Sequence, residues 1–297
     1  MKVAMYLYDS LLSLLDFPLR IWNLLLREVG FKKVFSTDST VSDSESTDYS
    51  SFVKLVSTND RSFKTFRRNF YYRQILEHVN YQLGLKYFNL LSEQSKRTLI
   101  KNREIVALSK IGAPRRYFFP KLGLISPTVI RYQYVSQELK RLFGDSFGTS
   151  VVEIGVGFGG QLVVLARNFR IISYAIFDLP QVINLTHKVV VASGESEKII
   201  KDCDINEPFI ENCELVISNY AFSELPKEIQ SGYIEGVLKN ARRGYLIMNS
   251  GRTDFSGRSS GKYSLDELRL LLPKFEVLPE SPLTGPDNYV IVWGHQS

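Results

Sequence analysis

The sequence predicts an α/β protein whose second half forms a mostly parallel sheet with an antiparallel last strand, preceded by a helical region. From residue 150 onwards, short runs rich in Val and Ile alternate with stretches of helical periodicity. This alternation is typical of a parallel sheet with right-handed crossovers. A glycine-rich loop follows the first run and opens the first helix. The last two apolar runs are joined only by residues 281–287, and so short a connection requires antiparallel strands.

The composition is that of an ordinary soluble protein, and it argues against several functional classes. Of 297 residues, 44% are hydrophobic and 23% are charged, and a net charge of +6 is too small to indicate a partner by itself. No apolar run is long enough to cross a bilayer. Cys203 and Cys213 fit neither a zinc site nor a disulfide framework, and the three histidines are too scattered for a metal site. We expect a cytoplasmic protein with reduced thiols and no bound metal.

Residues 1–35 are the one part of the chain that suggests a membrane. Charged residues interrupt their leucines, which argues against a signal peptide, and Pro18 would break a single helix. The pattern predicts two amphipathic helices, which can lie on a membrane surface, pair with a partner or fold back onto the body. Residues 36–51 consist mainly of small hydroxyl and acidic residues and predict a flexible acidic linker.

Residues 52–145 form the predicted helical region, which we expect to act as a lid over the substrate. Apolar residues recur near helical spacing as far as Ile105. The stretch Arg61–Arg73 mixes cations with aromatics, which suits either nucleic-acid binding or an amphipathic helix with inward aromatics and solvated cations. Glycine and proline then force turns between residues 111 and 128. A helix follows that begins near Thr128 and ends before Gly144.

Residues 146–297 form the predicted sheet domain. Its expected strands cover residues 151–155, 173–179, 215–219, 244–249, 275–279 and 288–295. Its expected helices cover residues 160–168, 181–191, 227–239 and 265–272. A third strand is implied before Asp204, because we count the run at 215–219 as the fourth. Ligands of such sheets lie beyond the carboxyl ends of the strands, so the loops there are where we expect the site.

The glycine-rich loop is the first of these loops. Glycine is needed where the backbone turns sharply or a ligand approaches it closely, and the following helix offers free N–H donors. These donors suit the carboxylate of a methionine group as well as a pyrophosphate. The cofactor-binding residues predicted on the loop are Glu153, Gly155, Gly157, Phe158, Gly159 and Gly160.

The glycine spacing alone does not choose between a methyl donor and NAD, because it also satisfies the dinucleotide pattern GxGxxG. A carboxylate at Glu153 suits an ammonium or a sulfonium better than a pyrophosphate. The loop also comes in mid-chain after a long helical region, and an antiparallel terminal pair is not expected in a dinucleotide-binding fold. These features favour S-adenosylmethionine as the cofactor.

Two further acidic residues follow strands. Asp178 ends its strand and can accept hydrogen bonds from both ribose hydroxyls, with Leu179 beside it, or it can cap the helix that Pro180 begins. Asp204, with Ile205, is placed where a loop after the third strand would reach an adenine amino group, although Asp202 competes for that role.

The fourth strand leads to the candidate catalytic residues. Asn219 and Tyr220 are expected under the methyl donor. Glu224 is the first candidate for a general base, although it can also cap the next helix. His295, after the last strand, is the second candidate base. From the helical region, the expected acceptor contacts are Arg131, Tyr132 and Tyr134, because tyrosine faces and an arginine fork suit a sugar or a nucleotide-sugar phosphate.

With these residues identified, the chain resembles a family of sugar O-methyltransferases from bacterial surface-polysaccharide gene clusters, within the class I S-adenosylmethionine-dependent methyltransferases. The resemblance covers about Gly112 to Trp293. It is carried by 111–114, Ser126-Pro127-Thr128 with Arg131-Tyr132, the glycine loop, Asp178-Leu179-Pro180, Ser218-Asn219 with Ser223-Glu224-Leu225, and Gly244-Tyr245-Leu246. The first 51 residues depart from the family pattern.

The resemblance implies methyl transfer from S-adenosylmethionine to a sugar hydroxyl in polysaccharide biosynthesis, with a small-molecule or glycan substrate and no nucleic acid. Two other possibilities stay open at this point. One is methylation of RNA or protein, with Arg61–Arg73 as the tether. The other is a non-catalytic interaction module that acts through partners by way of residues 1–35.

Overall fold

The computed structural model describes residues 47–145, 147–249 and 261–295. All of these belong to one unit, which begins at Thr40. The helices predicted for residues 1–35 and the first part of the predicted linker, residues 36–46, lie outside the described residues.

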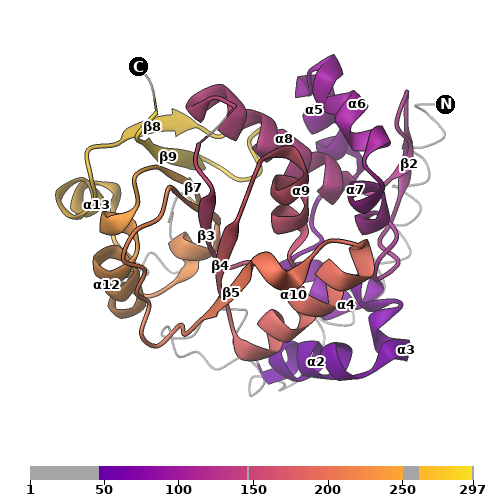
Figure 1. The fold of residues 1–297 in the computed structure, drawn as a ribbon, viewed down its shortest axis with the longest axis horizontal. Coiled ribbons are helices and arrows are strands. Elements are labelled where there is room, and N and C mark those ends of the chain that lie inside the picture. Colours follow the sequence, from indigo (N-terminus) through magenta and orange to yellow (C-terminus); the bar gives the residue numbers. More distant parts are fainter. Residues whose placement is uncertain (1–46, 146, 250–260, 296–297) are drawn as a thin grey trace, which may run out of the picture. The chain divides into compact units, whose positions relative to one another are not determined.

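A seven-stranded sheet lies between layers of helices (Figure 1). Its strands in spatial order are β5 (Ile200–Cys203), β4 (Ser173–Phe177), β3 (Ser150–Ile154), β6 (Leu215–Asn219), β7 (Gly244–Met248), β9 (Tyr289–Trp293) and β8 (Glu276–Pro279). The first five strands are parallel, whereas β9 runs antiparallel between β7 and β8. This is the class I methyltransferase fold, so the predicted fold class and the antiparallel last strand are confirmed.

The two faces of the sheet are covered by different helices. Figure 1 shows α9 (Gly160–Asn168) and α10 (Pro180–Ser193) on one side, and α12 (Lys227–Gly236) and α13 (Leu265–Leu271) on the other. Because side chains alternate along a strand, Val152 and Ile154 join the core under α12 and α13. Glu153 therefore points to the face covered by α9 and by α8 (Pro127–Phe143), which packs on α9.

The predicted helical region is built into the same unit as the sheet. It contains α2 (Thr47–Thr58), α3 (Asp60–Phe63), η2 (Phe66–Arg68), α4 (Phe70–Ile75), α5 (Tyr81–Leu90), α6 (Glu93–Lys101) and α7 (Arg103–Leu108). Helix α2 packs on α10, and α7 packs on both α9 and α10. A hairpin that we did not predict as strands, β1 (Tyr117–Phe119) with β2 (Gly123–Ile125), precedes α8. Three short helical segments complete the described part: η3 (Glu197–Ile199), α11 (Ala221–Glu224) and η4 (Leu238–Asn240).

The prediction of a linker as far as Ser51 was wrong for its last residues, because α2 already includes Thr47 to Ser51. Tyr49 is only 2% exposed, and Val53, one turn later, is fully buried. The ring of Tyr49 also stacks on that of Tyr72, with centroids 6.3 Å apart. The buried apolar residues one turn apart on α2, which packs on α10, therefore outweigh the polar composition around them.

The stretch Arg61–Arg73 is a solvated basic face only in part. It is divided among α3, η2 and α4, and Phe66 and Tyr72 are buried as the amphipathic reading expected. That reading was wrong for Arg67, which is 1% exposed and forms an ion pair of 2.5 Å with Glu77. The Nη1 group of Arg67 also donates to the Leu108 carbonyl at 2.7 Å. Arg67 therefore helps to hold the helical region together and is lost to the proposed nucleic-acid tether, whereas Arg61, Lys64 and Arg68 stay exposed.

The sequence predicts no membrane-spanning helix, no metal site and no disulfide. No described helix is both long enough and apolar enough to span a bilayer. The described part holds no cluster of three or more His, Cys, Asp or Glu arranged to bind a metal. Cys203 and Cys213 are both free thiols.

Candidate active site

A cavity of about 440 Å³ lies at the carboxyl ends of β3, β4 and β6. This is the edge of the sheet where parallel α/β folds bind their ligands. Predicted cofactor and catalytic residues in its wall are Glu153, Gly155, Gly157, Phe158, Asp178, Leu179, Ile205, Asn219, Tyr220 and Glu224. Of the predicted acceptor contacts, Arg131 and Tyr132 also line it. One continuous space thus gathers residues from five separate stretches of the chain.

The four glycines of the loop have different roles. A Cβ on Gly155 would lie 2.1 Å from Cβ of Ala221, and one on Gly160 would lie 2.3 Å from Cε2 of Tyr132. Gly159 likewise has no room for a Cβ, because a side chain of α10 lies against it. Only Gly157 has space, with φ +58° and its nearest neighbour, Leu76, at 3.7 Å. Gly159 and Gly160, predicted to bind the cofactor, do not line the cavity and instead allow close packing, whereas Gly157 borders the cavity.

Asp178 connects the end of β4 to the glycine loop. Its Oδ2 accepts from the Gly157 N–H at 2.9 Å, and its Oδ1 accepts from the Leu179 N–H at 2.8 Å. Burial raises the pKa of Asp178 to about 6, against the lowering effect of these two bonds. The residue does not cap α10 with its side chain, since Leu179 is the N-cap. Each carboxylate oxygen retains a second lone pair for a ligand.

Glu153 is a carboxyl group almost completely removed from water. It is 1% exposed, its Oε2 accepts from the Tyr174 hydroxyl at 2.8 Å, and its Oε1 accepts from Asn219 Nδ2 at 3.4 Å. Burial raises the pKa of Glu153 to about 8. A cation entering the cavity would restore the charged form of this group and gain a strong partner.

Three buried polar atoms of the cavity wall have no hydrogen-bond partner: Arg131 Nε, Gln161 Oε1 and Asn219 Oδ1. Buried polar atoms are nearly always paired, so these three indicate a polar ligand at this end of the cavity. The guanidinium of Arg131 lies 5.2 Å from the centre of the Tyr220 ring. Among the described residues it forms no ion pair. Gln161 was missed by our sequence analysis, because no motif distinguishes it from other residues of α9.

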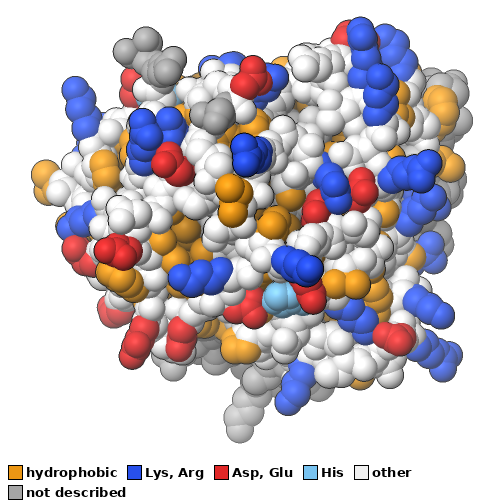
Figure 2. Space-filling model, viewed as in Figure 1, with side chains coloured by type: hydrophobic (Ala, Val, Ile, Leu, Met, Phe, Trp, Pro, Cys, Tyr) orange, Lys and Arg blue, Asp and Glu red, His pale blue; other side chains and the backbone are white. Residues whose placement is uncertain are grey.

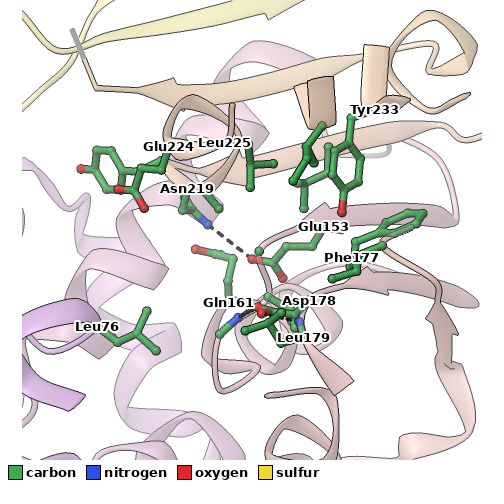
Figure 3. Close-up of a pocket in the computed structure, with 18 of the residues that line it drawn as sticks. Leu76, Glu153, Gln161, Phe177, Asp178, Leu179, Asn219, Glu224, Leu225 and Tyr233 are labelled. Atoms are coloured by element: carbon green, nitrogen blue, oxygen red, sulfur yellow. Dashed lines mark hydrogen bonds between the residues drawn. The ribbon is translucent and has the colours of Figure 1, made fainter. Parts of the chain in front are cut away.

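The opposite end of the cavity is apolar. Phe177 and Tyr233 meet edge to face, with ring centroids 5.4 Å apart. Figure 3 shows these two rings together, with Asn219 and Glu224 on the other side of Glu153. Leu179, Ile205 and Ile229 also line the cavity. The cavity therefore offers an apolar slot at one end and charged and amide groups at the other.

Tyr220 has an uncommon backbone conformation for a residue with a side chain, with φ +74° and ψ −32°. Its hydroxyl donates to Glu280 and lies 3.0 Å from Thr284 Oγ1. Burial raises the pKa of Tyr220 to about 12. Strain of this kind persists where surrounding contacts fix it and is often found at functional sites.

Glu224 lies on the cavity wall and is exposed. Its Oε1 accepts from Asn249 Nδ2 at 2.9 Å, and the residue does not cap α12, whose N-cap Pro226 has no side-chain bond. His78 was not among our candidates, yet it also lines the cavity, with its ring 6.5 Å from that of Tyr220. Glu224 and His78 are thus exposed side chains of the cavity wall that can take up a proton, as is Glu228.

Two predicted contacts lie elsewhere. Asp204 is exposed, and its Oδ1 accepts from the backbone N–H of Asn206 at 2.8 Å, so it turns away while Asn206 lines the cavity. Tyr134 lines a separate cavity of about 210 Å³, where its ring packs against Tyr87 at 5.3 Å. Asp202 is paired with His187 at 2.8 Å and does not line the main cavity either.

The prediction that His295 reaches the site was wrong. Trp293, at the end of β9, lies opposite Gly244, the first residue of β7. Because β9 is antiparallel, its last residues lie at the amino ends of the parallel strands, away from the cavity. His295 forms an ion pair of 3.3 Å with Glu276 at that edge.

No protein family model matches the chain, and no curated protein matches it. Among solved structures, a methyltransferase from Aquifex aeolicus, described as SAM dependent, is 16% identical, with 55% of this chain and 95% of that chain covered and a TM-score of 0.38. An O-methyltransferase family protein from Burkholderia thailandensis is 13% identical, with 58% and 57% covered and a TM-score of 0.42.

A third similar structure is an O-methyltransferase from neocarzinostatin biosynthesis, in complex with S-adenosylmethionine and 2-hydroxy-5-methyl naphthoic acid. It is 15% identical, with 57% of this chain and 58% of that chain covered and a TM-score of 0.38. This chain therefore spans little more than half of the last two proteins. The fold class rests on the strand order described above.

Proposed function

We propose that the protein is an S-adenosylmethionine-dependent O-methyltransferase that acts on a hydroxyl of a sugar, a nucleotide sugar or a glycan. The observation that carries this proposal is the division of the cavity. An apolar slot lies at one end, the buried carboxyl of Glu153 and three unpaired polar atoms lie at the other, and Asp178 belongs to the same wall. These three kinds of surface match the adenine, the ribose and the zwitterionic amino acid of that cofactor.

The residues of the cavity fit each part of that cofactor. The slot at Phe177 and Tyr233 suits the adenine, and the second lone pairs of Asp178 suit the ribose hydroxyls. Glu153 suits the ammonium. Arg131 was expected to bind the acceptor, but its charge acts on Glu153, and this favours the methionine carboxylate as its partner. When bound, the cofactor supplies a methyl group already activated on a sulfonium.

A pyrophosphate fits the same residues poorly. The carboxyl group of Glu153 would face its negative charges inside a water-poor cavity, where like charges repel strongly. The donor therefore remains S-adenosylmethionine rather than NAD in this proposal.

The protein's own task is to position the acceptor hydroxyl and to remove its proton. Glu224 is the proposed general base, since it lines the cavity near Asn219 (Figure 3). Asn249, which donates to Glu224, would orient its carboxylate. His78 is the alternative base; it lies in the connection between α4 and α5, with its ring 6.5 Å from that of Tyr220. Tyr132 offers an aromatic surface to a sugar ring.

The experiment that tests the proposal is transfer of an isotope-labelled methyl group from S-adenosylmethionine to a panel of acceptors. The panel holds nucleotide sugars, short glycans, short RNAs and a protein extract, with Glu224→Gln as the control enzyme. Label in a nucleotide sugar or glycan, much reduced with Glu224→Gln, would support the proposal. Label only in RNA or protein would replace the acceptor class. Binding of the donor without transfer to any class would favour a non-catalytic module.

A further inference from the structure

The charge of the chain is concentrated in one segment. Residues 93–121 contain eight Lys and Arg against two Glu, a net charge of +6, which equals the net charge of the whole chain. Within the part of the chain that the structure describes, Arg97, Lys101, Arg103, Lys110 and Arg116 are exposed and form no ion pair with an acidic side chain. The charges of the other residues sum to zero, although residues 61–73 also hold five Lys and Arg and no acid. Residues 93–121 therefore carry a charge large enough to attract anions at long range.

Large apolar side chains are exposed beside these cations. Phe118 on β1 and Leu124 on β2 face each other across the hairpin and are 41% and 62% exposed. Ile100 on α6 is 47% exposed, and Leu90 at the end of α5 is 42% exposed. Single exposed apolar residues are ordinary, but a cross-strand pair at the edge of a basic segment is not explained by folding.

The hairpin and α6 belong to one neighbourhood. Lys121 in the hairpin turn forms an ion pair of 2.9 Å with Glu93, the first residue of α6. Arg97, Ile100 and Lys101 follow at helical spacing and share the exposed side of α6. Figure 2 shows Lys and Arg side chains along the upper right of the view, where Figure 1 labels α5, α6 and β2. We name this set of exposed cations and apolar residues between Leu90 and Leu124 the basic-apolar face.

We propose that the basic-apolar face docks on an anionic lipid membrane. Cations near an anionic surface are attracted by its potential, and long Lys and Arg side chains keep their charges at the headgroups while neighbouring apolar groups enter the interface. The exposed apolar residues are mainly aliphatic, which suits an acyl boundary, whereas single-stranded nucleic acid is bound by stacking on aromatic rings. This inference does not depend on the proposed methyltransferase activity, and it concerns a different surface from residues 1–35.

The test is cosedimentation of the full-length chain with vesicles of phosphatidylcholine alone or with added phosphatidylglycerol. We expect binding only to the anionic vesicles, with affinity that falls as salt increases. Arg97→Glu with Lys101→Glu should weaken binding at least about 25-fold, since each cation near the surface contributes roughly fivefold. Phe118→Ser with Leu124→Ser should weaken it about tenfold or more, by removing the apolar contribution.

A control with the same change in charge is Arg170→Glu with Lys274→Glu, at two exposed positions outside the face. Leu270→Ser, at a side chain that is 86% exposed on α13, is the apolar control. Equal losses in the controls and in the face variants would overturn the proposal, as would failure of the wild-type chain to bind anionic vesicles at low salt. Competition of a short RNA for the face, without vesicle binding, would overturn it in favour of nucleic acid. Thermal melting checks that every variant is folded.

Discussion

The carboxylate of Asp178 accepts a hydrogen bond of 2.9 Å from the N–H of Gly157 and so holds the glycine loop against the end of β4. The same carboxylate is the proposed ribose ligand. Gly157 is the one glycine of the loop at which a side chain would meet open space. Asp178 is therefore both the proposed cofactor ligand and the residue that shapes the glycine loop. Its replacement should affect both the stability of the fold and the binding of the cofactor.

Asp178→Ala should abolish measurable binding of S-adenosylmethionine and lower the free energy of unfolding by about 1–3 kcal/mol, because the Gly157 and Leu179 N–H groups lose a charged partner. Urea denaturation and calorimetry measure the two effects. The matched control is Asp202→Ala, at an exposed acid on the neighbouring strand β5, which should change neither. Retained cofactor affinity in Asp178→Ala would contradict the assignment of the ribose ligand.

The affinity for S-adenosylmethionine should rise with pH below about 8. Burial raises the pKa of Glu153 to about 8, so the group is largely protonated at neutral pH, and a bound ammonium requires its ionised form. Binding then releases a proton, and affinity rises up to about tenfold per pH unit until Glu153 is ionised in the free protein. For the same reason, ionisation of Glu153 destabilises the unliganded fold as pH rises from the ordinary carboxyl range towards 8.

Calorimetry across pH, in buffers of different ionisation enthalpy, measures this proton release. Glu153→Gln should bind more weakly and lose the pH dependence. An affinity of the wild-type protein that is flat between neutral pH and 8 would mean that Glu153 does not face the ammonium.

Glu77→Ala should lower the free energy of unfolding by about 3–5 kcal/mol, because it leaves the buried guanidinium of Arg67 without its counter-ion. Urea denaturation provides the value. Glu93→Ala removes the exposed partner of Lys96 and Lys121 and should change the stability little. Similar stability of the two variants would show that the Arg67–Glu77 pair does not hold the helical region.

Glu224→Gln should reduce kcat about 10²- to 10⁴-fold without weakening cofactor binding, if Glu224 is the general base. His78→Gln is the companion variant, and we expect a smaller loss that appears mainly in KM, because His78 lies on the wall that covers the acceptor. Steady-state kinetics with the acceptor found in the methyl-transfer panel separate the two. A large fall in kcat only for His78→Gln would reassign the base.

Much of the fold could be predicted because periodicity follows directly from burial. The runs at β3, β4, β6 and β7 are apolar because both faces of the sheet are covered, and the short connection before β9 fixes its direction. The cofactor-binding residues could be predicted as well, because residues that follow parallel strands meet at one edge of the sheet. The hairpin β1–β2 escaped prediction because its strands are only three residues long and lie between glycines and prolines.

The residues that the sequence analysis missed come from outside the strand ends. Tyr49 in α2, and Leu76 and His78 in the connection between α4 and α5, reach the cavity from far away in the sequence, and no local pattern predicts such contacts. The error at His295 has a different origin. The direction of β9 was predicted correctly, and an antiparallel strand ends at the edge opposite the site, so this candidate was inconsistent with the predicted topology.

Isothermal titration of the wild-type protein with S-adenosylmethionine and, separately, with NAD tests the central claim most directly. The account predicts binding of S-adenosylmethionine at a single site, with a Kd of about 1 μM to 1 mM, and no binding of NAD. Binding of NAD in its place would contradict the reading of Glu153 as the partner of a cationic ligand. Binding of neither would contradict the claim that this cavity is a cofactor site.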